Sequence, residues 1–147
     1  MTSHQVYLGL GSNLGDREGN IRKAIALLHE RVGEVVRQSS LIETVPWGFE
    51  SEHRFLNGVI LCETTLTPRQ VLKATQKIER ELGKTKAHAT KRQLSMLNSQ
   101  LPTFKDRPID IDILLYDDWK VDEPDLKIPH PLMRERDFVM IPLKEIL

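Results

Sequence analysis

The length, composition and charge of this chain exclude several classes of protein. Its 147 residues are 39% apolar and 29% charged, which suits one globular domain with a single core. The formal net charge is zero, so overall charge does not favour nucleic acid or an anionic membrane as a partner. A single cysteine, Cys62, excludes disulfides and cysteine-based zinc sites within the chain. The lack of a long apolar run predicts a cytoplasmic protein without a membrane span.

The chain begins with a predicted strand, a glycine turn and a helix. Residues 5–10 form the strand, and residues 11–16 (Gly-Ser-Asn-Leu-Gly-Asp) are typical of a turn followed by a helix cap. Apolar residues then recur at helical spacing: Ile21, Ala24, Ile25 and Leu28. They predict a helix from about 17 to 31 that ends near Gly33. The turn could hold phosphate, but it lacks the P-loop lysine and the third glycine of the dinucleotide fingerprint, which favours a structural turn.

Two further strands are predicted at 34–44 and 55–64. Between them, residues 45–49 (Val-Pro-Trp-Gly-Phe) form a loop that either covers a ligand or packs on the core, because Trp and Phe are costly to expose. Asn57 stands among apolar neighbours in the third strand. Its amide offers a donor and an acceptor side by side, suited either to the edge of a heterocycle or to securing the neighbouring loop.

The second helix is predicted over residues 68–82. Thr67 is a good N-cap, Pro68 suits the first turn, Gln70 stands three residues after the cap, and Gly83 is the expected stop. The tripeptide that starts at Gly83 (Gly-Lys-Thr) imitates the end of a P-loop, but the glycine required five residues earlier is Ile78. The pattern therefore excludes a Walker-type nucleotide site.

Residues 84–106 show no clean period and are predicted to form a long connection, with one short amphipathic turn marked by Leu94, Leu97 and Leu101. Residues 84–107 carry an excess of positive charge, because Asp106 is their one acidic residue. The basic residues are Lys84, Lys86, Lys91, Arg92, Lys105 and Arg107. A basic connection of this length predicts a lid that becomes ordered over a polyphosphate. The alternative is a passive surface excursion.

Residues 107–116 (Arg-Pro-Ile-Asp-Ile-Asp-Ile-Leu-Leu-Tyr) predict a buried strand that carries two carboxylates. Side chains alternate along a strand, so Asp110 and Asp112 point to the same side with Cα atoms roughly 6 to 7 Å apart. A divalent cation would keep both ionised, and oxygen ligands favour Mg²⁺ or Mn²⁺. The alternative is an edge strand with one solvated polar face.

The C-terminal tail is predicted to consist of short elements separated by prolines. In it, His130 could be a phosphate donor or a turn residue, and Phe138 could be a core residue or a stacking platform. The element order strand, helix, strand, strand, helix, strand predicts an α+β fold: a ferredoxin-like βαββαβ antiparallel sheet with helices on one face and a short C-terminal extension.

Several short motifs, taken in chain order, resemble the 6-hydroxymethyl-7,8-dihydropterin pyrophosphokinase (2-amino-4-hydroxy-6-hydroxymethyldihydropteridine diphosphokinase) family. The resemblance runs through essentially the whole chain. The motifs are the turn at 11–16, the Phe-Leu-Asn at 55–57, Gln76 with Ile78 and Glu79, Arg107 with Asp110 and Asp112, Pro129 with His130, and Arg136 with Phe138.

The resemblance implies one pyrophosphokinase domain over residues 1–147. It would transfer the β,γ-diphosphate of ATP to the hydroxymethyl group of the pterin and release AMP, in folate biosynthesis. The implied partners are these two small molecules, without nucleic acid or membrane, and the implied state is a monomer.

The resemblance also implies roles for individual residues. Two Mg²⁺ ions would be held by Asp110 and Asp112, which with Arg107 and Lys84 form the catalytic set. The implied pterin-binding residues are Thr44, Pro46, Trp47, Phe55, Asn57 and Phe138. The implied ATP-binding residues are Gln76, Glu79, Lys86, Ile113, His130 and Arg136.

Two other classes of protein share this pattern of elements. A nucleotidyl transferase also places paired aspartates on such a sheet, and a non-catalytic RNA- or ligand-binding domain can have the same topology. The low aromatic content, 5%, and the lack of a basic-aromatic run argue against an RNA-binding sheet.

Overall fold

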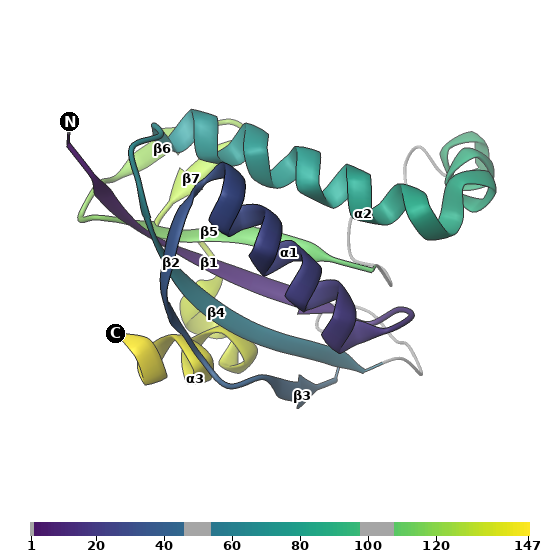
Figure 1. The fold of residues 1–147 in the computed structure, drawn as a ribbon, viewed down its shortest axis with the longest axis horizontal. Helices are drawn as coiled ribbons and strands as arrows, with labels where there is room; N and C mark the ends of the chain where they lie inside the picture. Colours follow the sequence, from purple (N-terminus) through teal and green to yellow (C-terminus); the bar gives the residue numbers. More distant parts are fainter. Residues whose placement is uncertain (1, 46–53, 98–107) are drawn as a thin grey trace.

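An antiparallel sheet forms the centre of the protein (Figure 1), in a computed structural model that describes residues 2–45, 54–97 and 108–147, with 84–97 described by their backbone alone. Strand β1 (His4–Ser12) lies between β4 (Phe55–Thr64) and β5 (Asp110–Tyr116). Both β2 (Gly33–Gln38) and β3 (Ile42–Thr44) pair with the other side of β4. The strand order is β2-β4-β1-β5, and all these pairs are antiparallel.

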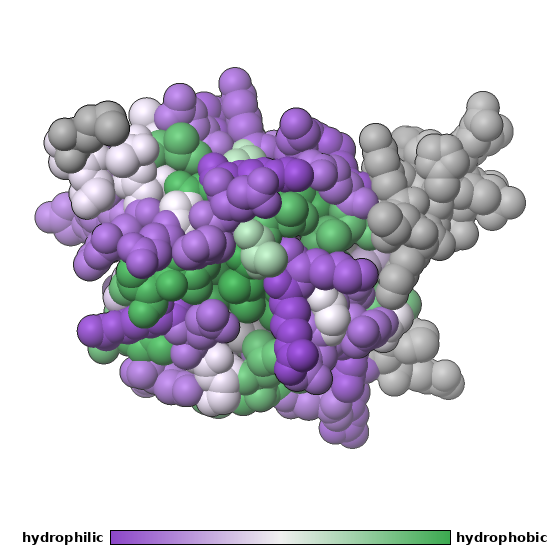
Figure 2. Space-filling view, viewed as in Figure 1, coloured by the Kyte–Doolittle hydropathy of each residue, from purple (hydrophilic) through white to green (hydrophobic). Residues whose placement is uncertain are grey.

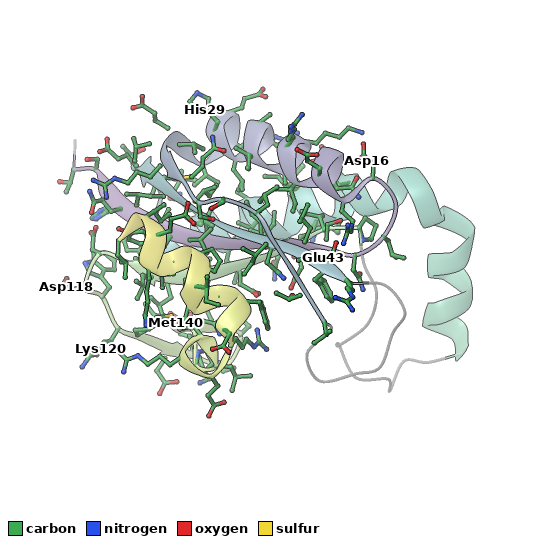
Figure 3. All side chains as sticks on the ribbon, turned by 90° about the horizontal axis from the view of Figure 1, so that it is seen from below. Asp16, His29, Glu43, Asp118, Lys120 and Met140 are labelled. Atoms are coloured by element: carbon green, nitrogen blue, oxygen red, sulfur yellow. The ribbon has the colours of Figure 1, made fainter. Side chains whose placement is uncertain are left out.

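Helices cover both faces of this sheet. Helices α1 (Arg17–Arg31) and α2 (Pro68–Leu97) lie on one face, and α3 (Asp137–Ile146) lies on the other, as Figures 1 and 3 show. A small hairpin, β6 (Val121–Glu123) and β7 (Leu126–Ile128), and a 3-10 turn, η1 (Met133–Glu135), connect β5 to α3. The expectation of helices on one face is therefore wrong for α3.

The apolar sequence of β4 explains why both faces need cover. Ile60 and Cys62 belong to the core under α1 and α2, whereas Val59 and Leu61 belong to the core under α3. Because side chains alternate along a strand, an uninterrupted apolar run buries both faces of the sheet. The tail that was expected to hold only short elements supplies the second cover as a ten-residue helix.

Two predicted elements, α1 and β4, have the predicted bounds, and the N-cap of α1 explains where that helix begins. Helix α1 spans Arg17–Arg31, and the side chain of Asp16 accepts a hydrogen bond from the Gly19 amide (3.0 Å). Gly15 adopts a φ of 68°, a backbone conformation that favours glycine. Strand β4 spans Phe55–Thr64, as expected.

The glycine turn is shorter than predicted, because Gly11 and Ser12 belong to β1. Described contacts tie this segment to α1: Asn20 Nδ2 donates to the Leu14 carbonyl oxygen (2.9 Å) and to Ser12 Oγ (3.4 Å). These contacts agree with the structural reading of the turn.

The second predicted strand, 34–44, is divided into β2 and β3. Ser39 interrupts it: the Val59 amide donates to Ser39 Oγ (2.8 Å), while the Ser39 amide donates to the Val59 carbonyl. Leu41 then lies so close to Gly58 that a Cβ at Gly58 would be 2.6 Å from its Cδ2. At Ser39, a side-chain hydrogen bond to the backbone of β4 takes the place of a regular backbone hydrogen bond between strands.

The largest difference concerns α2, which does not end at Gly83 but continues to Leu97. The predicted start is confirmed: the Thr67 amide donates to Gln70 Oε1 (2.9 Å) and the Gln70 amide donates to Thr67 Oγ1 (3.2 Å). More than half of residues 84–97 are good helix formers (Lys, Ala, Leu, Arg, Gln and Met), so one glycine does not stop the helix. The prediction of a loop is therefore wrong for 84–97, whereas 98–106 lie outside the described residues.

The distribution of polar and apolar residues on the surface is that expected of amphipathic helices packed on a sheet. Figure 2 shows hydrophilic residues over much of the face on which α1 and α2 lie, with apolar residues gathered between them. Within the described ranges, no helix is both long enough and apolar enough to cross a membrane.

Candidate functional site

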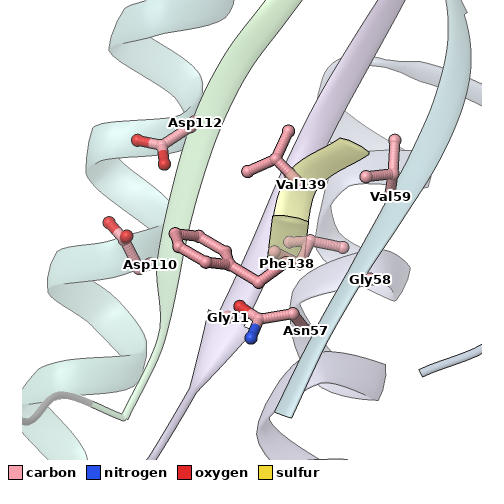
Figure 4. A pocket seen from close by; sticks show the side chains of 10 residues that line it. Gly11, Asn57, Gly58, Val59, Asp110, Asp112, Phe138 and Val139 are labelled. Atoms are coloured by element: carbon pink, nitrogen blue, oxygen red, sulfur yellow. The ribbon is translucent and has the colours of Figure 1, made fainter. Parts of the chain in front are cut away.

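A pocket opens on the α3 side of the sheet, where three strands place chemically different residues in register (Figure 4). The pairing of β1 with β4 and β5 produces two rows across the sheet. The rows are Asp110–Gly11–Asn57 and Asp112–Gly9–Val59. The central strand, β1, contributes a glycine to each row, so no side chain stands between the outer residues. The two carboxylates on β5 therefore lie across from the amide and the apolar side chain on β4.

Both aspartates line this pocket, as their spacing in β5 predicts. Arg136 is buried, with 8% of its surface exposed, and its Nη1 lies 4.0 Å from Asp112 Oδ2. The guanidinium therefore partly balances the negative charge of the aspartate pair.

Glu79 of α2 contacts the same stretch of β5. Its Oε2 accepts a hydrogen bond from the Ile111 amide (2.8 Å), between the two aspartates in sequence. Burial raises the pKa of Glu79 to about 8; the charges of Asp110 and Asp112 also raise it, and the Ile111 hydrogen bond opposes them. Three carboxyl groups thus meet at this part of β5.

Asn57 is buried and bridges two strands at the other side of the pocket. Its Nδ2 donates to Thr44 Oγ1 (2.6 Å), which ties β3 to β4. A Cβ on Gly11 would lie 2.8 Å from Asn57 Oδ1 and 3.4 Å from the Phe55 ring. Glycine at position 11 thus leaves the room that the amide and the ring occupy. Of the two sequence readings of Asn57, the hydrogen bond to a neighbouring segment is present, and the residue also lines the pocket.

Phe138 lies over the pocket from the start of α3 (Figure 4). It is half-buried and packs against the core under α3, and the Arg136 guanidinium carbon lies 5.5 Å from its ring centroid. Its ring is therefore part core and part pocket lining, and its role as a stacking platform stays a prediction.

His130 is held near the carboxylates by two backbone contacts. Its amide donates to the Leu114 carbonyl (3.0 Å), and its Nδ1 lies 3.3 Å from the Leu132 amide, which donates to it. Since Nδ1 acts as the acceptor, the neutral ring carries its proton on Nε2 and can donate from there. Burial lowers the pKa of His130. The positive charge of Arg136 lowers this pKa further, whereas the negative charge of Asp110 raises it.

The remaining predicted site residues lie apart from this pocket or outside the described residues. Gln76 is exposed on α2, and the Ile113 side chain is buried in the core under α1 and α2, so only its backbone is open to a ligand. The backbone of Lys84 and Lys86 lies in α2, but their side chains are not described. The residues outside the described ranges are Pro46, Trp47 and Arg107.

The donor set fits a magnesium ion that is shared with a ligand. Among residues 2–45, 54–83 and 108–147, no group of three or more His, Cys, Asp or Glu side chains is arranged to hold a metal alone. Two carboxylates supply hard oxygen ligands but leave most of an octahedral sphere to water or phosphate oxygens, as Mg²⁺ usually has.

Sequence reasoning missed the glycines that form the floor and the apolar residues that line one side, Val59 and Val139. A signal was present: Gly9 and Gly11 are two residues apart in an otherwise apolar strand, so both glycines fall on one face. The partner strands that complete the pocket are set by long-range pairing, which no local pattern shows.

Comparisons with known proteins show the family of this chain. The family model described as 7,8-dihydro-6-hydroxymethylpterin-pyrophosphokinase (HPPK) matches residues 7–147. A 2-amino-4-hydroxy-6-hydroxymethyldihydropteridine pyrophosphokinase of Porphyromonas gingivalis is 47% identical over 142 residues, covering 96% of this chain and 89% of the relative. The protein of the same name from Bacillus subtilis is 40% identical over 141 residues, covering 95% and 76%.

Among solved structures, an HPPK-DHPS in complex with substrates superposes with a TM-score of 0.72 at 13% identity. It aligns with 99% of this chain, which spans 40% of that longer chain. At this identity the likeness concerns the fold, and it extends through the whole of the present chain.

Proposed function

Given that this chain belongs to the 7,8-dihydro-6-hydroxymethylpterin-pyrophosphokinase family, we propose that the pocket between β1, β4 and β5 is its active site. The enzyme transfers the β,γ-diphosphate of ATP to the hydroxymethyl group of 6-hydroxymethyl-7,8-dihydropterin and releases AMP, a step of folate biosynthesis. One observation supports the location: two carboxylates face an amide across two glycines, so one pocket has a metal-binding side and a side for a polar heterocycle.

In this proposal Asp110 and Asp112 would hold two Mg²⁺ ions together with the phosphates of ATP. When bound, Mg²⁺ lowers the negative charge that the phosphates present to the incoming hydroxyl. One of the two carboxylates accepts the proton of that hydroxyl. Arg136, behind Asp112, holds the carboxylate in place and adds positive charge near the phosphates.

The pterin is bound on the opposite side of the pocket. Asn57 and Thr44 are already hydrogen-bonded to each other and present their remaining polar atoms to the edge of the ring. Phe138 and Phe55 stack on its faces, which suits a flat π-system. Pro46 and Trp47 complete this set in the proposal.

ATP is bound along β5 and α2. His130 donates from Nε2 to a phosphate, Arg136 adds charge, and the backbone of Ile113 contacts the base. Gln76 and Glu79 also belong to this proposed set. Three basic residues, Lys84, Lys86 and Arg107, are proposed to meet the phosphates.

The proposal for the whole chain is one domain over residues 1–147 that acts as a cytoplasmic monomer. Its sheet is assigned to the ferredoxin-like class, with β2 and β3 together in the place of one strand. The strand order β2-β4-β1-β5 supports this assignment. Size-exclusion chromatography with light scattering tests the monomer.

Identification of the leaving product tests the reaction. The protein is incubated with ATP, Mg²⁺ and 6-hydroxymethyl-7,8-dihydropterin, and the nucleotides are separated. AMP is expected from a pyrophosphokinase. ADP would indicate a simple kinase, and pyrophosphate a nucleotidyl transferase; either product would contradict the proposal.

Substitution of the aspartates tests the site. We expect Asp110→Asn and Asp112→Asn each to fold normally and to lose kcat by roughly three orders of magnitude or more, because the carboxylate charge that binds the metal is gone. Asp118→Asn, in the exposed turn after β5, is the matched control and should keep full activity. Folded variants of Asp110 or Asp112 with near-normal turnover would refute the assignment.

A further inference from the structure

Arg17 connects three separate parts of the chain near the pterin side of the pocket. It is the first residue of α1, directly after the N-cap Asp16. Its Nη2 donates to Glu43 Oε2 in β3 (2.9 Å), and its Nη1 donates to the carbonyl oxygen of Arg54, just before β4 (3.0 Å). In Figure 3, Asp16 and Glu43 lie at the same end of the molecule.

These contacts differ from those of an ordinary surface ion pair. The Arg17 side chain is one-third exposed, and its guanidinium donates from two nitrogens to two different segments. The Arg22 side chain, on the same helix, is 75% exposed and pairs with Glu18, one turn away. A cation in the first turn of a helix also opposes the helix dipole, so Arg17 gains nothing from its place in α1. Its favourable interactions are with β3 and the residue before β4.

The strand that Arg17 holds needs support. Strand β3 has three residues and pairs with β4, with Glu43 opposite Leu56 and Thr44 opposite Phe55. So short a strand is weakly held by its own backbone bonds. Side-chain contacts among the described residues fasten it further, and they include the Arg17–Glu43 pair and the Asn57–Thr44 hydrogen bond at the pocket.

We propose that Arg17 is a positioning residue for pterin binding, which keeps β3 against β4 so that Thr44 stays in hydrogen-bonding distance of Asn57. The inference rests on the proposed function, because it takes Thr44 and Asn57 as the polar groups that contact the pterin. Arg17 itself acts through Glu43 and the Arg54 carbonyl.

The test compares Arg17→Met with Arg22→Met in the full chain. Calorimetry gives the Kd of 6-hydroxymethyl-7,8-dihydropterin and of a non-hydrolysable ATP analogue, and steady-state assays give kcat and KM. We expect Arg17→Met to raise the pterin Kd and KM roughly tenfold, with the Kd of the ATP analogue and kcat within about twofold. Arg22→Met removes the same charge from the same helix and should leave all four values unchanged.

Glu43→Gln shows whether Arg17 acts through Glu43. If it does, the effects on pterin Kd are not additive, and Arg17→Met/Glu43→Gln binds pterin little worse than Arg17→Met alone. Additive effects would overturn the inference, as would unchanged pterin binding in Arg17→Met or a loss confined to the ATP analogue. Wild-type protein that releases no AMP would instead refute the proposed function, so the two failures are distinguishable.

Discussion

Single residues determine the shape of the pocket on this sheet. Gly9 and Gly11 remove two side chains from the middle of β1, and the space is bounded by Asp110 and Asp112 on β5 and by Asn57 on β4. A methyl group at Gly11 would meet Asn57 Oδ1 at 2.8 Å, closer than ordinary van der Waals contact. The pocket therefore depends on the missing side chains as much as on the polar residues around it.

His130 should make the stability of the ligand-free protein depend on pH. Its pKa is lowered in the folded state, mainly by burial, so the unfolded chain binds the proton more readily. The stability that His130 contributes is therefore present above about pH 6.5 and is lost as pH falls through the lower, folded-state pKa. Arg136 and Asp110 are the charged groups that act on the ring, with opposite signs.

His130→Asn tests this, because an Asn side chain can accept from the Leu132 amide without titrating. Urea unfolding between about pH 5 and 7.5 should show a weaker fall in stability towards acid than in the wild type. His29→Asn is the matched control: His29 Nδ1 also accepts a backbone amide, that of Val35, but on the exposed surface. An identical pH slope in His130→Asn and the wild type would contradict the prediction.

At the level of elements, the end of α2 is where the structure differs most from the sequence prediction. A glycine followed by lysine looks like a helix end, and Gly83 was expected to be one. In the structure the helix passes through Gly83, where a Cβ would meet no atom within 4 Å. The residues beyond it favour helix strongly enough to continue the hydrogen-bond ladder.

Gly83→Ala should therefore stabilise the protein by roughly 0.5 to 1 kcal/mol, since alanine is the better helix former and has room. Gly33→Ala is the matched contrast: a Cβ there would lie 1.8 Å from the Glu63 carbonyl oxygen, so β2 and β4 would have to separate. We expect it to cost roughly 1 to 3 kcal/mol. Urea denaturation measures both, and destabilisation by Gly83→Ala would indicate that the helix ends at Gly83 after all.

At the level of the whole molecule, one sheet separates two apolar cores. The larger core lies under α1 and α2, and the smaller one lies between the sheet and α3. The pocket opens on the smaller side, at the start of α3, where Phe138 and Val139 meet the strands. The site thus depends on the seating of α3, which is one of the last elements of the chain.

The reactivity of Cys62 measures how often the larger core opens. Its side chain is fully buried in the larger core, and burial raises the pKa of its thiol to about 12, so a folded molecule presents almost no thiolate. A thiol reagent at pH 7.5 should therefore react at least ~1000-fold more slowly with the native protein than with the urea-unfolded chain. Addition of ATP and the pterin should slow the reaction further by stabilising the folded state. Rapid labelling of the native protein would show that the core opens far more often than this packing implies.

The sequence by itself determined the local elements and the family. Periodicity, caps and turn residues gave the bounds of α1 and β4, the start of α2 and the pairing of Asp110 and Asp112 on one face, because these features depend on neighbours within one or two turns of chain. It failed at Gly83, where a stop signal competed with the helix propensity of the following residues, and at Ser39, where a side chain replaces strand pairing.

Only the tertiary structure decided how these pieces meet. The rows that join Asp110 to Asn57 through Gly11 require the register of three strands from distant parts of the chain, and a shift of one residue would turn each side chain to the other face. The placing of α3 on the second face and the contact of Arg17 with Glu43 have the same origin. Such pairings arise from packing the whole core, and no stretch of sequence contains them alone.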